Sequence, residues 1–93
     1  MPKAKTMLDE LARVLKAREH AIQRVDRRAY TRPWGINESR AWTESENLVR
    51  DLGDKAVMEY DNIMENKPGK RVMQKAYHMM PGYLIREHDY FNR

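Results

Sequence analysis

Apolar residues recur at helical spacing along the first third of the chain. This stripe advances in steps of three, four or seven positions and consists of Leu8, Leu11, Leu15, Ile22, Val25 and Ala29. Arg18 interrupts it, and neither glycine nor proline breaks residues 3–32. Thr6 followed by Asp9 resembles a capping box at a helix start. The pattern predicts an amphipathic helix over about residues 6–31.

A second amphipathic helix is predicted after a connector at residues 32–37. Its apolar face consists of Leu48, Val49, Leu52, Ala56, Tyr60, Ile63 and Met64. Thr43 with Glu46 forms a capping box and favours a helix over residues 43–66. An earlier start, giving a helix over residues 38–66, is the alternative. A Pro-Gly pair follows and ends the helix.

The last third of the chain predicts a short helix and an aromatic arm. The helix covers about residues 69–80, and its apolar face consists of Val72, Met73, Ala76, Tyr77 and Met80. A second Pro-Gly pair ends it. Residues 83–93 are too rich in aromatic side chains for a disordered tail. We expect them to dock as an extended arm or a last helical turn through Tyr83, Leu84, Ile85, Tyr90 and Phe91.

Together these segments predict an all-α fold and one small helical domain over residues 1–93. Its body is a long helical hairpin, to which the short third helix and the arm attach. The first stripe fits either the core of this hairpin or a coiled-coil seam with another chain. The residues expected to be buried are Leu11, Leu15, Ile22, Leu48, Leu52 and Ile63.

Charge is sorted by segment along the chain. Residues 1–32 carry nine Lys/Arg against four Asp/Glu, and residues 33–66 carry three against eight. Residues 67–93 are basic again, with six against two. A basic helix followed by an acidic one predicts that the two pair antiparallel, within one chain or between two. Arg18, at an inward position, is expected to meet a carboxylate, because a buried charge needs a partner.

Composition narrows the class of protein. The chain has no cysteine, which excludes disulfides, thiolate zinc sites and a cysteine nucleophile. No apolar run approaches the roughly 20 residues that span a bilayer, and residues 1–32 contain no signal-peptide core. We therefore expect an intracellular protein, cytoplasmic or within an organelle such as the mitochondrion, and not a secreted one.

No catalytic, metal or cofactor motif is found. His20, His78 and His88 lack the spacing that places two ligands on one helix face. Residues 67–70, Lys-Pro-Gly-Lys, lack the glycine pattern and the hydroxyl of a phosphate-binding loop. The sequence predicts a protein that is not an enzyme and that needs no cofactor or metal.

The sequence favours a non-enzymatic structural or interaction subunit of a larger intracellular protein assembly. It would bind other protein subunits through the long amphipathic helix and the aromatic arm. The candidate partner-binding residues are Arg24, Arg28, Arg32, Met79, Met80, Tyr83, Leu84, Tyr90 and Phe91.

The alternative is a small nucleic-acid-binding protein, including a ribosome-associated one, that uses its basic helix faces. Lys and Arg would contact phosphates, and Gln could read a base edge. The candidate residues for this role are Lys70, Arg71, Gln74, Lys75 and His78.

Overall fold

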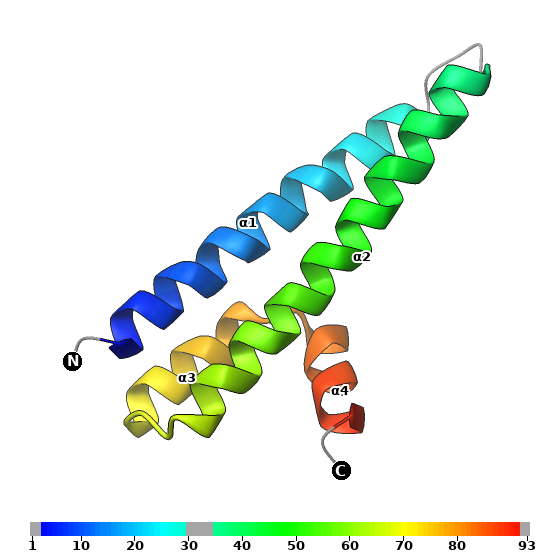
Figure 1. Cartoon of the computed structure of the whole chain (residues 1–93). Helices are drawn as coiled ribbons and strands as arrows, with labels where there is room; N and C mark the ends of the chain where they lie inside the picture. The colour runs from blue at the N-terminus through cyan, green and yellow to red at the C-terminus, as the bar shows by residue number, and fades with distance from the viewer. Residues whose placement is uncertain (1–2, 30–34, 92–93) are drawn as a thin grey trace.

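The computed structural model describes residues 3–29 and 35–91, with the side chains of residues 3–5, 28, 29, 38 and 91 left out. This part of the chain is helical and contains no strand, which confirms the predicted all-α fold (Figure 1). The helices are α1 (Lys3–Ala29), α2 (Ile36–Glu65), α3 (Lys70–Met79) and α4 (Gly82–Phe91).

The two long helices form an elongated antiparallel hairpin (Figure 1). α1 has 27 residues and α2 has 30. The molecule measures 51 × 28 × 17 Å, with a radius of gyration of 15.8 Å. A compact domain of this size would have a radius of gyration of about 12 Å. The predicted antiparallel pairing is confirmed, and the long first helix is one leg of the hairpin.

An apolar seam joins the two legs. On α1 its buried positions advance by three or four residues, as expected for a helix that packs along one face. The buried residues of the two helices are Leu11, Val14, Arg18 and Ala21 on α1, and Ser45, Gly53, Ala56, Tyr60 and Ile63 on α2. They therefore include one charged side chain, that of Arg18.

The observed seam is displaced slightly from the predicted stripe. Leu11 and Ile63 are fully buried, as expected. Leu48 was predicted to be buried, and this is wrong, because 40% of its surface is exposed. The remaining predicted residues are half-buried along the edge of the core, and these are Leu15, Ile22 and Leu52.

Charged side chains of α1 and α2 lie at the edge of the seam and influence one another's pKa. Arg13 and Glu10 form an ion pair within α1, with 2.6 Å between Nη2 and Oε1. The hydrogen bond from Arg13 lowers the pKa of Glu10, and Lys55 of α2 acts in the same direction. Glu10 raises the pKa of Arg13, and Glu59 of α2 adds to this effect. Charges of α1 and α2 thus influence each other across the seam in two pairs, Glu10 with Lys55 and Arg13 with Glu59.

The two short helices pack at one end of the hairpin (Figure 1). α3 contacts both α1 and α2, whereas α4 packs mainly on α2. The core contains Ala76 of α3, Leu84 and Ile85 of α4, and Met80, which follows the end of α3. The predicted extended arm or single turn is thus wrong, because the segment forms a helix of ten residues. The Pro81 carbonyl accepts hydrogen bonds from the backbone N–H groups of Leu84 and Ile85 and starts that helix.

Two helices begin earlier than predicted. α1 begins at Lys3, so Thr6 lies inside the helix and does not cap its start. α2 begins at Ile36, close to the alternative start at residue 38, so the predicted capping box at Thr43 is wrong. The Thr43 hydroxyl instead donates to the carbonyl of Ser39 at 3.0 Å, one turn earlier in the same helix. The end of α2 is as expected: Lys67 adopts a φ of 45°, and Pro68 cannot continue the helix.

We predict that Leu11→Ala lowers the free energy of unfolding by about 2–5 kcal/mol, because it leaves a cavity in the seam. Leu48→Ala is the matched control and should change it by less than about 0.5 kcal/mol, as surface substitutions do. Urea titration followed by circular dichroism measures both. Equal losses for the two variants would contradict the position of the seam.

Candidate functional site

A groove lies between α1 and α3 and encloses about 560 Å³. Its lining residues are Leu8, Asp9 and Ala12 of α1, and Arg71, Gln74, Lys75, His78 and Met79 of α3. Leu8 and Met79 are half-buried and pack against the core, so the floor of the groove is apolar. Ala12 is exposed and adds a small apolar side chain to that floor. We call this feature the α1/α3 groove.

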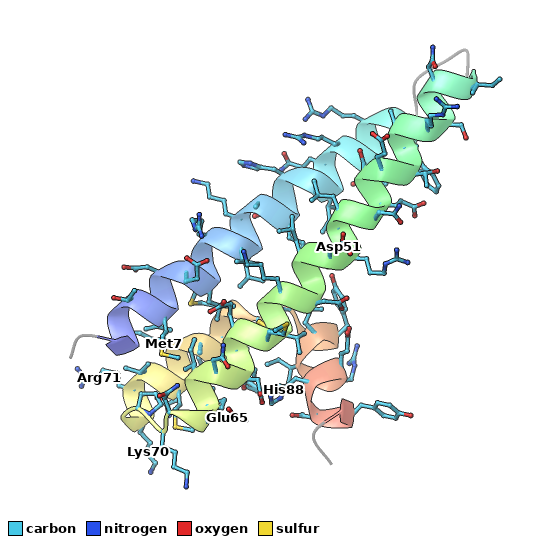
Figure 2. All side chains as sticks on the ribbon, viewed as in Figure 1. Met7, Asp51, Glu65, Lys70, Arg71 and His88 are labelled. Carbon is cyan, nitrogen blue, oxygen red and sulfur yellow. The ribbon has the colours of Figure 1, made fainter. Side chains whose placement is uncertain are left out.

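One rim of the α1/α3 groove is basic. Gln74, Lys75 and His78 lie three, four and seven positions after Arg71, so the four residues share one face of α3. All are exposed. Arg71 and Lys70 lie at the start of α3 (Figure 2). The opposite rim carries a single acidic side chain among the residues that line the groove, Asp9.

The structure thus brings together residues that the sequence assigned to two different functions. Four of the five nucleic-acid candidates line the groove, and Lys70 does not. Met79, assigned to partner binding, lines the same groove from its floor. The sequence pattern alone could not join them, because the groove depends on how α3 lies against α1.

A second cavity of about 500 Å³ lies where α1, α2 and α4 meet. Arg18 enters it from α1 with only 8% of its surface exposed, and its guanidinium lies 5.0 Å from the centre of the Tyr83 ring. Its Nε is buried and has no hydrogen-bond partner in the described part of the chain. Burial lowers the pKa of Arg18. The cavity is also lined by the carboxylates of Glu46, Asp54 and Glu87.

Gly53 gives Arg18 the space to cross α2. A Cβ atom built on Gly53 would lie 3.6 Å from Arg18 Nε and 3.7 Å from Leu84 Cδ2. These are ordinary van der Waals distances, so the crossing leaves room for one methyl group and little more.

His88 joins α4 to α2, a structural role that the sequence pattern did not predict. Its Nε2 lies 2.9 Å from Asp61 Oδ1 and its Nδ1 lies 3.4 Å from Asp89 Oδ1. Its ring meets Tyr60 edge to face, with 4.9 Å between the centroids. Burial raises the pKa of Tyr60, and Asp89 adds to this effect. Figure 2 shows His88 reaching from α4 toward α2.

A helical spacing was the signal that could have revealed His88. Leu84 and Ile85 lie four and three positions before His88, so the three residues share one face if the segment is helical. Among the residues that the structure describes, no group of three or more His, Cys, Asp or Glu side chains is placed to hold a metal ion.

The other predicted partner-binding residues are distributed over the molecule. Met80 and Leu84 are buried in the core and offer no free surface. Tyr83 and Tyr90 of α4 remain 48% and 67% exposed. Arg24 is exposed on α1. The side chains of Arg28 and Phe91, and the whole of Arg32, lie outside the described residues.

Comparison with known proteins gives no relative from which a function could be inferred. No protein-family model, curated protein or solved structure matches the chain. Within residues 3–29 and 35–91, none of the helices combines the length and the apolar character needed to cross a membrane.

We predict that Gly53→Ala raises the free energy of unfolding by about 0.5–1 kcal/mol, because glycine is unfavourable inside a helix by that amount. The added methyl group fits at van der Waals distance from Arg18 and Leu84. Gly53→Leu should instead destabilise the protein by about 1–3 kcal/mol through overpacking. Thermal and urea unfolding measure both, and a loss of stability in the alanine variant would contradict the described crossing.

We further predict that Arg18→Met leaves the free energy of unfolding unchanged or raises it by about 1 kcal/mol. The substitution keeps the apolar stem and removes a buried charge whose Nε donor is unsatisfied. Arg18→Ala should lower stability by about 1–2 kcal/mol, because it also removes the packing of the stem. A methionine variant that is clearly less stable than the native chain would show that the guanidinium stabilises the fold.

Proposed function

We propose that this chain is a non-enzymatic interaction subunit of a larger protein assembly and that the α1/α3 groove is its main contact surface. The observation that supports this most is the composition of the groove: an apolar floor of Leu8, Ala12 and Met79 beside a rim of exposed polar and basic side chains. Protein interfaces combine an apolar centre with a polar rim in this way, and arginine is enriched in them.

Exposed aromatic side chains provide a second reason for the proposal. Tyr83 and Tyr90 stand on α4 with about half or more of their surface exposed, and Tyr77 of α3 is 54% exposed. Tyrosine supplies a large apolar area and a polar tip, which suits contact with another protein. In this proposal, α4 adds a smaller second contact to the assembly.

Nucleic-acid binding is the second candidate function. The observation in its favour is the single exposed face of α3 that carries Arg71, Gln74 and Lys75. Such a face suits phosphate contacts, which weaken steeply as salt is added. The apolar floor and Asp9 beside this face favour a protein over a phosphate backbone.

The absence of cysteine allows a direct test with single-cysteine variants. Ala12→Cys places a photo-crosslinker in the α1/α3 groove, and Ala17→Cys places it on an exposed position of the same helix outside the groove. We predict that the label at position 12 captures a discrete protein from an extract of the source cells, and that the label at position 17 does not. The same protein should co-purify with the unlabelled chain at a fixed stoichiometry by native mass spectrometry.

The outcome separates the two candidate functions. Capture that survives nuclease treatment and moderate salt supports the interaction subunit. Cross-linking to nucleic acid, with binding that falls steeply between low and moderate salt, would replace it with the second function. Equal capture at both positions, or none at either, would contradict a contact through the groove.

A further inference from the structure

We propose that the α1/α3 groove receives an acidic amphipathic helix of a partner protein. This inference rests on the interaction function proposed above and specifies the chemistry of the partner. It follows from two independent properties of the groove, its shape and the distribution of charge along its rims.

The shape of the groove suits a helix. Both walls are helices, and the lining side chains on each recur at helical spacing: Leu8 and Ala12 on α1, and Arg71, Gln74 or Lys75, and His78 on α3. A third helix can pack its side chains between those of α1 and α3. Its axis would then lie about 8–10 Å from the axis of each of these two helices. In this arrangement, an apolar side chain of the partner would contact Leu8, Ala12 and Met79.

The length of the groove sets the size of the contact. Arg71 and His78 are seven positions apart on α3, which corresponds to about 10 Å along the helix. The partner would therefore insert about two turns, with apolar residues at positions i, i+3 or i+4, and i+7. An extended strand would find no unpaired backbone edge here, because both walls are helical.

The charge of the rims determines which side of the partner helix is acidic. Arg71 and Lys75 are one turn apart and exposed on the α3 rim, so carboxylates of the partner would face α3. Asp9 lies on the α1 rim, so the partner's opposite flank would be neutral or basic. Complementary rims of this kind fix orientation and suppress wrong partners.

Synthetic peptides of equal length can test this inference on the full chain. The first carries a leucine stripe with glutamates along one flank. The second replaces the glutamates with lysines, and the third keeps the glutamates but replaces the leucines with glutamines. We expect the first peptide to bind at least about tenfold more tightly than the other two by fluorescence anisotropy.

Charge reversal of the rim provides the decisive comparison. The double variant Arg71→Glu with Lys75→Glu should prefer the lysine peptide over the glutamate peptide. The control variant Lys16→Glu with Arg24→Glu reverses two exposed charges of α1 outside the groove and should keep the original preference. Circular dichroism confirms that both variants retain their helices.

Several results would overturn the inference. The native chain could bind none of the peptides, or it could bind the glutamine-stripe peptide as tightly as the leucine-stripe peptide with glutamates. The double variant Arg71→Glu with Lys75→Glu could also keep the native preference for the glutamate peptide. An oligonucleotide that displaces the acidic peptide and binds more tightly would assign the groove to nucleic acid. A dimer in sedimentation velocity that the rim reversal dissociates would assign it to a second copy of the chain.

The peptide experiment and the cross-linking experiment test different statements, so failure of one can be distinguished from failure of the other. Protein capture at position 12 without peptide discrimination would retain the proposed interaction function and remove the acidic helix. Peptide discrimination without any captured protein would retain the chemistry of the groove and remove the proposed place in an assembly.

Discussion

The apolar seam between α1 and α2 is the contact on which the rest of the structure depends. The two long helices contact each other more extensively than any other pair of helices in the described part of the chain. Full burial of one Leu or Ile is worth about 1.5–3 kcal/mol, and Leu11 and Ile63 are both fully buried. α3 and α4 extend the same core by covering one end of this seam. The α1/α3 groove exists only because the seam fixes α1 as one of its walls.

Arg18 shows how the seam accommodates a charge. A guanidinium in such a position is unfavourable unless its charge is compensated. Here it passes Gly53 and lies over the ring of Tyr83, whose face attracts cations. The expected carboxylate partner is replaced in this contact by an aromatic ring, while acidic side chains line the surrounding cavity. One glycine, one arginine and one tyrosine thus join three helices at a single crossing.

The sequence predicted those parts of the fold that depend on local pattern. The hairpin follows from two long amphipathic segments of opposite charge, and the turns follow from the Pro-Gly pairs. Val14 and Ala21 were missed because the prediction followed the larger Leu and Ile side chains beside them. Leu48 was misplaced for a similar reason. Successive residues of a helix point about 100° apart, so an error of one position in the predicted apolar face selects a side chain that is not buried. The capping box at Thr43 failed because the preceding residues continue the helix.

The candidate site could be predicted only in its components. Arg71, Gln74 and Lys75 follow from the pattern of the third helix, but their position beside Leu8 and Ala12 depends on tertiary packing. No local signal in the sequence specifies that the two walls meet. His88 is the opposite case, because a helical spacing in the last segment carried the information and the expectation of an arm obscured it.

The one-sided position of α3 and α4 makes the hairpin thermodynamically uneven along its length. At that end the two legs share their core with further helices, whereas toward the connector they have mainly each other, and Ile36 is largely exposed there. Regions with few buried apolar contacts open locally at a lower free energy than the global unfolding. The end that carries α3 and α4 should therefore open less readily than the two-helix end near the connector. A ligand in the α1/α3 groove would bind the more stable end, and local opening of the other end would leave its site intact.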